Sequence, residues 1–461
     1  MPPRPRVEST VKRPICGGSS DGGTRASDTR RCYVFRPRVG ARRGRDFGGG
    51  AGYRPRVRRA ETASKLLLLG SLYLAQGLPD GFFRQALPVM LRAQGVSLEH
   101  IGLASLLALP WGLKFLWAPV VDAIGSPRFG RRRSWIVPLQ LTAVAVFLLL
   151  SQAEPQRGLT PLLVGVLLIT ALAATQDIAT DGLAVALLRP EERGLGNGVQ
   201  VAGYRLGMIV SGGVLIIFHE QIGWANTFYA LAAAGALSLV PVLCTREPAA
   251  PPQAPASLRV FRELLRQPGM TSWLLVIATY KFGEAFGVAM LRPMLIDRGL
   301  ELADLGWITG TAGFIASLVG ALLGGALVSA FGRHRMLLVC GVVQALAVVS
   351  YASLALGPLD LGRVYLVCSF EHFSSGLATV PLFTMMMDAT RPHAAGTDYT
   401  AQACVVVLAT IVASTPSGYS AHALGYPGHF ALAAGLCLLG MVPALTHRAR
   451  VRRGATQIAS L

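Results

Sequence analysis

Two aspartates stand one helical turn apart within a long apolar run. Asp177 and Asp181 are four residues apart, so both carboxylates face the same side of a helix. Ionised carboxylates this close repel each other in a low-dielectric setting, which favours the uptake of a proton by one of them. A proton-carrying pair is therefore favoured over a structural ion pair, because two acids cannot neutralise each other. Arg205, in the next apolar run, is the expected counter-ion of Asp181.

Other polar side chains interrupt the apolar runs at spacings that place them on common helix faces. Asp80 and Arg84 can pair across one turn, and Lys281 is three residues from Glu284. For both pairs, a place in a solute cavity and a purely structural ion pair are equally open. The candidate cavity residues are Gln76, Asp80, Arg84, Gln176, Asn197, Gln200, Tyr204, Lys281, Glu284, Arg292, Glu371 and His372.

A basic break follows the second apolar run. Asp122 ends that run eight residues before Gly130, which precedes three arginines. We expect Asp122 to pair with charges and dipoles at helix ends and so to latch a gate; the arginines also serve as a topology signal. Lys114 either extends to the membrane surface or meets an acid of the run at 161–187. The predicted gate residues are Lys114, Asp122, Arg131, Arg132 and Arg133.

Long apolar segments must position these residues. Of the 461 residues, 52% are hydrophobic and only 15% are charged, well below the quarter or so that is usual in soluble domains. A membrane span needs about 20 apolar residues. Twelve segments qualify, which predicts an all-α membrane protein with helices near 66–92, 100–121, 135–152, 161–187, 195–218, 225–244, 271–295, 304–330, 336–356, 361–387, 398–420 and 426–446.

The first 64 residues differ in composition from the rest. They hold 16 Arg or Lys against 5 Asp or Glu and lack an apolar run, so they are predicted to be a basic disordered arm. An over-extended gene start, with the translated protein beginning near Val57 or Leu66, is one explanation of this composition. An arm that binds anionic lipid or nucleic acid is the less favoured functional alternative.

Arginine placement predicts the topology. Seventeen arginines lie in the C-terminal tail and the connections after even-numbered segments, and about four lie in the opposite connections. By the positive-inside rule, both termini face the cytoplasm.

The chain repeats itself at an offset of about 202 residues. Arg189-Pro190 recurs as Arg391-Pro392, and the Gly130 break recurs at Gly332. The predicted organisation is an N-terminal six-helix bundle at 65–244, a cytoplasmic linker at 245–270, a C-terminal six-helix bundle at 271–446 and a basic tail at 447–461.

Motifs for metal, cofactor or catalysis are missing from the sequence. The seven cysteines have no CxxC or Cys/His ligand spacing, so neither a metal site nor a cofactor is expected. There is no HExxH, P-loop or GxSxG motif, so we expect a protein that is not an enzyme.

The sequence resembles one branch of the major facilitator superfamily, which holds the AmpG-type muropeptide permeases, the acetyl-CoA transporters and the RhtX/FptX siderophore permeases. The resemblance covers residues 66–445. It rests on Gln76-Gly77-Leu78-Pro79, Lys114-Phe115-Leu116-Trp117-Ala118-Pro119 with Asp122, Gly130-Arg131-Arg132-Arg133, Thr175-Gln176-Asp177-Ile178-Ala179 with Asp181, and Gly203-Tyr204-Arg205-Leu206-Gly207-Met208. It implies the major facilitator fold, with twelve transmembrane helices in two pseudo-symmetric six-helix bundles and helices 1, 4, 7 and 10 around a central cavity.

Within the branch, the sequence is more similar to the siderophore permeases. The details are Asp181-Gly182-Leu183-Ala184-Val185, Gly196-Asn197-Gly198-Val199-Gln200 and a twelve-helix layout. The resemblance implies a monomeric, multi-pass importer of the bacterial inner membrane that takes up a bulky anionic or peptidic solute, best a ferric siderophore, with protons.

In that mechanism Asp177 and Asp181 exchange the proton, and Arg205 modulates them. Arg84, Lys281 and Arg292 are expected to meet anionic groups of the solute. An AmpG-like anhydro-muropeptide permease for cell-wall recycling is the alternative, and a non-transporting membrane sensor or enzyme is a remote one. Twelve spans exclude a nucleic-acid-binding protein; the bilayer, the solute and protons are the expected partners.

Overall fold

The computed structural model describes residues 53–87, 109–153, 160–247 and 256–447. Helices make up nearly all of these ranges, which contain no β-strand. The all-α architecture predicted from the apolar runs is therefore confirmed.

In the first half of the chain, π-helical turns at Phe82–Ala86 and Ile209–Val214 extend the helices, and a 3₁₀ turn at Lys114–Leu116 joins two short ones. The helices are α1 (Tyr53–Gly81), α4 (Leu109–Leu113), α5 (Ala118–Ala123), α6 (Arg133–Leu150), α7 (Thr160–Leu187), α8 (Arg193–Met208), α9 (Leu215–Ser238) and α10 (Val240–Cys244).

The second half repeats this pattern with more interruptions. A π-helical turn at Trp307–Ala312 precedes α16, and a 3₁₀ turn at Pro392–Ala394 precedes α19. The helices are α11 (Arg259–Leu265), α12 (Met270–Tyr280), α13 (Phe282–Val288), α14 (Leu291–Asp297), α15 (Leu302–Gly306), α16 (Gly313–Phe331), α17 (Arg333–Ala355), α18 (Leu361–Asp388), α19 (Ala395–Ser414) and α20 (Ser417–Gly440).

Each of the twelve expected segments contains helix where the structure describes it, but several bounds and breaks differ. First, α1 begins at Tyr53, so residues 53–64, which were assigned to the arm, are helical. Second, the segment at 271–295 is split into α12, α13 and α14. Third, the linker holds a helix, α11, that was not expected, because seven residues are too few for a periodic signal. The predicted arm up to residue 52, residues 88–108 and the tail after His447 lie outside the described residues.

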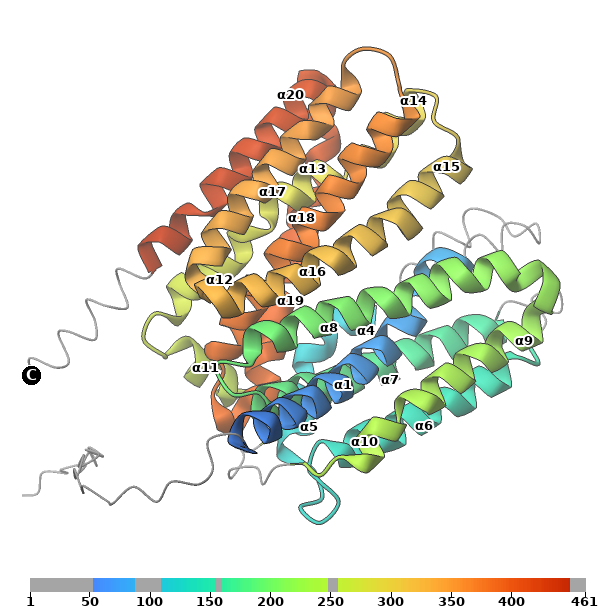
Figure 1. The fold of residues 1–461 in the computed structure, drawn as a ribbon, viewed down its shortest axis with the longest axis vertical. Helices are drawn as coiled ribbons and strands as arrows, with labels where there is room; N and C mark the ends of the chain where they lie inside the picture. The colour runs from blue at the N-terminus through green and yellow to red at the C-terminus, as the bar shows by residue number, and fades with distance from the viewer. Residues whose placement is uncertain (1–52, 88–108, 154–159, 248–255, 448–461) are drawn as a thin grey trace, which may run out of the picture. The chain divides into compact units, whose positions relative to one another are not determined.

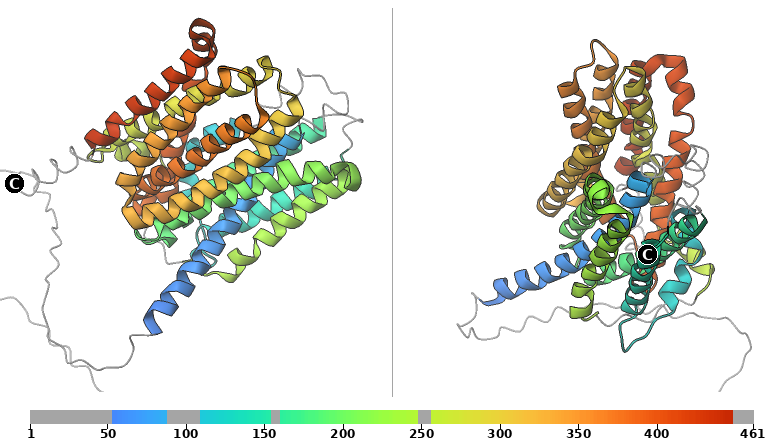
Figure 2. Two further views of the ribbon diagram at one scale, coloured as in Figure 1. Left: turned by 45° about the horizontal axis from the view of Figure 1, so that its top comes forward. Right: turned by 90° about the vertical axis from the view of Figure 1, so that its right-hand side faces the viewer.

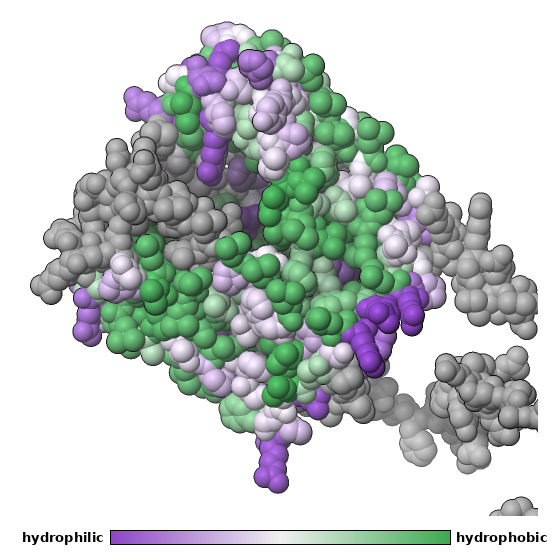
Figure 3. All heavy atoms as spheres, turned by 180° about the vertical axis from the view of Figure 1, so that it is seen from behind, coloured by the Kyte–Doolittle hydropathy of each residue, from purple (hydrophilic) through white to green (hydrophobic). Residues whose placement is uncertain are grey.

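The helices present apolar side chains to their surroundings. Within the described ranges, eight helical stretches are long and apolar enough to cross a membrane. Figure 3 shows apolar side chains over much of one face, with hydrophilic ones gathered toward its margins. The eight stretches are Arg133–Leu150, Thr160–Leu187, Gln221–Cys244, Met270–Asp297, Asp304–Phe331, Arg333–Ala355, Pro392–Ser414 and Ser417–His447.

The backbone carries the repeat that the sequence showed. Gly130 and Gly332 both have positive φ, of 102° and 84°, at the break before α6 and α17. Gly223 in α9 and Gly425 in α20 also have positive φ, of 77° and 66°, and both positions break a long helix into two. Each pair is 202 residues apart, and glycine adopts this conformation without a steric penalty. The two halves therefore turn their chain at corresponding places.

Close packing within and between the halves brings the polar residues together. In the first half α1 packs along α8, and in the second α16 packs along α18 (Figure 1). Across the halves α8 lies beside α16 (Figure 2), and α19 packs against α7 and α5. Residues far apart in sequence thus meet where α7, α8 and α19 converge.

Candidate functional site

A cavity lies between the two halves. It has an empty volume of about 950 Å³, part of which is open to solvent. Polar and aromatic side chains make up much of its wall. Its lining residues are Tyr73, Gln76, Trp111, Lys114, Asp177, Asp181, Gln200, Val201, Tyr204, Arg205, Thr379, Phe383, Tyr399, Ala403, Val406 and Val407.

The two aspartates of α7 face this cavity together with a lysine. Lys114 Nζ donates a hydrogen bond to Asp177 Oδ2, and the pair is a buried salt bridge. Asp181 Oδ1 instead accepts a hydrogen bond from the hydroxyl of Tyr73, at 2.7 Å. Lys114, Asp177, Asp181 and Tyr73 are all at most 6% exposed. We refer to these four residues as the acid cluster.

Local backbone structure explains how Lys114 reaches α7. The helix that contains it is interrupted by the 3₁₀ turn at Lys114–Leu116, and Lys114 Nζ lies 5.0 Å from the centre of the Trp111 ring. Of the two alternatives left open by the sequence, Lys114 adopts the second: it meets an acid of α7 and does not extend to the membrane surface. A lysine paired with a carboxylate avoids the cost of an isolated buried charge.

Arg205 lies elsewhere than expected. The sequence favoured it as the counter-ion of Asp181, but Asp181 binds Tyr73. The Arg205 guanidinium lies 5.2 Å from the centre of the Phe314 ring, and Nη1 lies 3.7 Å from Met208 Sδ. The reason is helix rotation: Arg205 points away from α1 toward the second half, whereas Asp181 points toward α1.

Two ion pairs of the second half lie outside the lining of this cavity. Lys281 Nζ is 2.6 Å from Glu284 Oε2, which also accepts a hydrogen bond from Gln344 Nε2. Glu371 Oε2 is 3.0 Å from His372 Nδ1. We refer to these five residues as the paired cluster. Each of its acids has a base of its own.

The remaining predicted cavity residues are spread over several places. Asp80 is partly buried, and the side chain of Arg84 lies outside the described residues. Arg292 is exposed on α14, so it does not line the cavity. Asn197 is buried, and its Nδ2 donates to Arg193 O at 2.8 Å. Sequence spacing grouped these residues by type, but their helices turn them in different directions.

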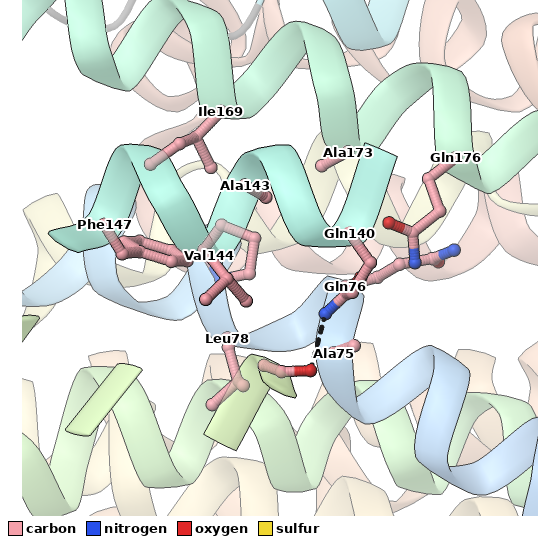
Figure 4. A pocket seen from close by; sticks show the side chains of 12 residues that line it. Ala75, Gln76, Leu78, Gln140, Ala143, Val144, Phe147, Ile169, Ala173 and Gln176 are labelled. Carbon is pink, nitrogen blue, oxygen red and sulfur yellow. Dashed lines mark hydrogen bonds between the residues drawn. The ribbon is translucent and has the colours of Figure 1, made fainter. Parts of the chain in front are cut away.

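Gln76 and Gln176 border a second, smaller pocket inside the first half. In Figure 4 the glutamines gather at one end of this pocket and apolar side chains such as Phe147 and Ile169 at the other. Gln140 Nε2 donates to Gly235 O at 3.1 Å, the dashed line in Figure 4. Both amide atoms of Gln76 and Nε2 of Gln176 are buried without a hydrogen-bond partner in the described part of the chain. Gln76 borders both this pocket and the larger cavity.

One of the predicted gate residues, Asp122, meets the start of α19. Asp122 Oδ2 accepts a hydrogen bond from Thr397 N at 2.6 Å, and Oδ1 accepts one from Gly396 N at 3.3 Å. A carboxylate at a helix N-terminus is stabilised by the unpaired N–H groups and by the helix dipole. Asp122 therefore joins the first half to the second at this end of the helices.

Residues that the sequence interpretation missed complete this end. Glu247 accepts hydrogen bonds from Arg132 N at 2.9 Å and Arg133 N at 3.2 Å, at the start of α6. Arg132 Nη1 also lies 3.4 Å from Glu247 Oε1. Arg131 Nη1 is buried and has no hydrogen-bond partner among the described residues. The arginine run is thus held to its own half by an acid just after the end of α10.

A second link between the halves is centred on Asp388. Arg193 Nη1 lies 2.6 Å from Asp388 Oδ1, and Arg333 Nη1 binds Asp388 Oδ2. Arg193 begins α8 in the first half, whereas Arg333 begins α17 in the second. The position of Asp388 at the end of α18, beside basic connections, was the available sequence signal.

Tyr73 and Tyr399 are the other cavity residues that were missed. Tyr73 is three residues before Gln76 and so shares its helix face. Tyr399 lies near the start of α19, and its ring packs edge-on to that of Phe383 at 6.3 Å. The polar face of the first apolar run could have identified Tyr73, whereas Tyr399 stands among small residues without such a signal.

Comparison with known proteins identifies relatives along most of the chain. The anhydromuropeptide permease of Escherichia coli K12 is 27% identical over 400 residues, 85% of this chain and 81% of the relative. An uncharacterised protein of Haemophilus influenzae is 27% identical over 82% of this chain and 93% of its own.

Solved structures share the fold. The transporter FucP in its outward conformation has a TM-score of 0.66 at 15% identity, covering 83% of this chain and 98% of its own. A bacterial homologue of the iron transporter ferroportin, in the outward-facing state, has a TM-score of 0.61 at 16% identity, covering 84% and 99%.

The family model described as Major Facilitator Superfamily matches residues 69–414. The helices, the repeat and the relatives agree with this match, and the resemblance to the AmpG-type permeases is confirmed. The chain belongs to the Major Facilitator Superfamily and is a membrane transporter with the fold of that family.

Proposed function

We propose that the protein is a proton-coupled permease of the bacterial inner membrane that imports anhydromuropeptides. The observation that supports this choice of solute is the similarity to the E. coli anhydromuropeptide permease, which extends over 85% of this chain. This reverses the order of the two solutes favoured by the sequence, because that relative is named for a muropeptide and no relative described above is named for a siderophore.

The cavity has the chemistry that a sugar-peptide solute needs. Tyr73, Tyr204 and Tyr399 offer rings and hydroxyls, and Gln76 and Gln200 offer amides, from α1, α8 and α19. Aromatic faces pack on the apolar faces of sugar rings, while amides bind hydroxyl and acetamido groups. Such a lining suits a neutral disaccharide with a charged appendage.

The acid cluster supports the proton role. Lys114 pairs with Asp177, whereas Asp181 has no salt bridge in the described residues and accepts a hydrogen bond from the neutral hydroxyl of Tyr73. A buried carboxyl without a base is stable when it holds a proton. Asp181 therefore takes up the proton and Asp177, held by Lys114, shapes the site; Arg205 does not contact either carboxylate.

The links between the halves at the end of the helices that holds Arg131, Arg132 and Arg133, which we call the basic end, support alternating access. Asp122 binds the first turn of α19, and Asp388 binds Arg193 across the halves. Both links must break before the cavity can open at this end, which we expect to face the cytoplasm by the positive-inside rule. Proton release from the acid cluster would then accompany release of the solute inside.

Uptake into proteoliposomes tests the function. We expect the wild-type protein to accumulate labelled anhydromuropeptide when the outside is made acidic, and not to accumulate a ferric siderophore. Accumulation of the siderophore alone would refute the proposal that the solute is an anhydromuropeptide.

The Asp181→Asn variant tests the coupling. The amide oxygen of the variant side chain can still accept the Tyr73 hydrogen bond, so the fold is kept while proton uptake is removed. We expect at least a hundredfold loss of gradient-driven accumulation, with solute exchange across the membrane retained. Full accumulation with unchanged pH dependence would contradict the proton role.

A further inference from the structure

Arg205 lines the cavity, and none of the described acids forms a salt bridge with it. Its guanidinium contacts the Phe314 ring and Met208 Sδ, and no carboxylate lies within 4 Å of it in the described ranges. It lines the same cavity as the acid cluster. A ring face and a thioether attract a cation only weakly compared with a carboxylate.

Three acids lie near enough to Arg205 to act on its charge, Asp80, Glu284 and Glu371, and none of them forms a salt bridge with it in the described residues. Glu284 is bound by Lys281 and Gln344, and Glu371 is bound by His372. The two lysines of the membrane core, Lys114 and Lys281, each have an acid partner. Arg205 therefore has no salt-bridge partner among the described residues, and the acids at longer range offset only part of its positive charge.

Glycine packing fixes the direction of Arg205. A Cβ at residue 207 would clash with Leu74 O, and one at residue 203 would lie 2.8 Å from Gly70 O, so this face of α8 must lie against α1. Residue 205 is two positions from both glycines, about 200° around the helix. Arg205 thus points away from α1, into the cavity and toward Phe314 of α16.

A fixed arginine in the membrane core with no acid paired to it in the described residues is costly, and such residues mark solute pathways. The planar guanidinium presents two parallel N–H donors that match the two oxygens of a carboxylate. Gln76, whose buried amide has no partner in the described residues, lines the same cavity and can bind the neutral part of such a solute.

We propose that Arg205 binds a carboxylate of the transported solute, so that the solute itself supplies the missing counter-charge. This inference rests on the proposed function, since it requires a solute to enter this cavity. It transfers the anion-binding role from Arg84, Lys281 and Arg292, where the sequence had placed it: Lys281 is paired, Arg292 is exposed, and the side chain of Arg84 is not described.

Two probes that differ only in charge test the inference. One is labelled N-acetylglucosaminyl-1,6-anhydro-N-acetylmuramic acid, which carries one carboxylate, and the other is its methylamide. Exchange of each across proteoliposomes of the full-length protein is measured, which separates binding from the proton gradient. For the wild type we expect a KM at least tenfold lower for the acid than for the amide.

Arg205→Gln should raise the KM for the acid at least tenfold and leave that for the amide within about twofold. Arg205→Lys should fall between, because an ammonium keeps the charge but loses the paired donors. Arg292→Gln is the matched control, since Arg292 is exposed and away from the cavity lining; it should keep the acid preference.

The possible failures are distinguishable. A folded Arg205→Gln protein that still prefers the acid tenfold overturns the inference while the proposed function stands. Wild-type exchange of the two probes at equal KM overturns it as well. Exchange of neither probe by the wild type overturns the proposed solute, and the carboxylate site falls with it.

Discussion

The acid cluster in the first half and the paired cluster in the second half solve the problem of buried charge in different ways. In the acid cluster one lysine serves two aspartates, and the second aspartate relies on a tyrosine hydroxyl. In the paired cluster Glu284 has Lys281 and Glu371 has His372. Both clusters are buried in the same fold, so burial alone does not distinguish them.

The difference lies in what each cluster lacks. The paired cluster gives each acid a base beside it in sequence, and hydrogen bonds link its helices without the help of a ligand: Gln344 of α17 donates to Glu284 of α13, and Lys281 donates to the Ser375 carbonyl of α18. The acid cluster lacks one positive charge, which a proton can supply. Arg205, between the clusters, lacks one negative charge, which a solute can supply. We therefore expect a functional role for buried charges that lack a partner, and a structural role for those that are paired.

Removing the single base of the acid cluster should have the largest effect. Lys114→Met leaves Asp177 buried without a partner, which costs about 3–5 kcal/mol for a broken buried pair. We expect uptake to be abolished and the thermal unfolding temperature in detergent to fall by several degrees.

Asp177→Asn in the same chain is the control. It removes the stranded charge, so the double variant should regain most of the lost stability without regaining coupled uptake. A double variant as unstable as Lys114→Met would mean that Lys114 acts through packing, and the comparison between the clusters would lose its electrostatic basis.

Exchanging Lys281 and Glu284, which form one ion pair of the paired cluster, should have a moderate effect on stability. In Lys281→Glu with Glu284→Lys, the charges are reversed but still adjacent. Gln344 can adapt, because its Oε1 has no partner in the described residues and can accept from the lysine introduced on α13. The Ser375 carbonyl, which now accepts from Lys281 at 3.2 Å, keeps the exchange from being neutral.

The measurement is the unfolding temperature with the uptake rate. We expect the double variant to recover at least half of the stability lost by Lys281→Glu alone. The corresponding exchange of Lys114 and Asp177 should recover less, because the introduced lysine would then stand on α7 one turn from Asp181, and the introduced acid would share this single base with Asp181. Equal recovery in both clusters would contradict the distinction drawn between them.

The sequence predicts the helices and the spacing of the site residues within one helix, but not which residues meet between helices. Asp177 and Asp181 were identifiable because spacing within one helix fixes their relative direction. The helices and their repeat followed from apolar runs and from Gly130 and Gly332. The choice of partners between helices, such as Tyr73 for Asp181, depends on helix rotation and tilt, which apolar periodicity does not define in helices that are apolar all round.

Arg205 shows that limit most clearly. Its charge suggested a partner acid, whereas the glycines on either side of it decide its direction. Asp388 and Glu247 were missed for another reason: they lie at helix ends and in connections between helices, where acids are ordinary and carry no periodic signal.

A buried acid at the basic end should give the smallest effect and a distinct pH dependence. Glu192 accepts hydrogen bonds from Thr62 at 2.7 Å and from Arg189 at 2.6 Å, and its side chain is 8% exposed. Burial raises its pKa, but the hydrogen bonds from Arg189 and Thr62 outweigh burial and lower the pKa of Glu192 to about 2. The ionised form is therefore the one that stabilises the fold.

This contribution is present above the ordinary glutamate pKa near 4.5 and is lost as the pH falls through that value toward 2. Because the Arg189 side chain is 43% exposed, solvent screens part of the interaction. Relative to Glu192→Gln, the wild type should be more stable by roughly 2 kcal/mol at pH 7, and the difference should shrink steadily below pH 5.

Glu263, 58% exposed and 3.1 Å from Arg391 in the second half, is the matched control for Glu192. Glu263→Gln should change stability by less than about 1 kcal/mol at any pH, as exposed pairs do. The measurement for both variants is the free energy of unfolding in detergent between pH 3 and pH 7. An equal and pH-independent loss of stability in both variants would show that Glu192 acts by packing. The difference in charge pairing between the two halves would then be limited to the residues of the membrane core.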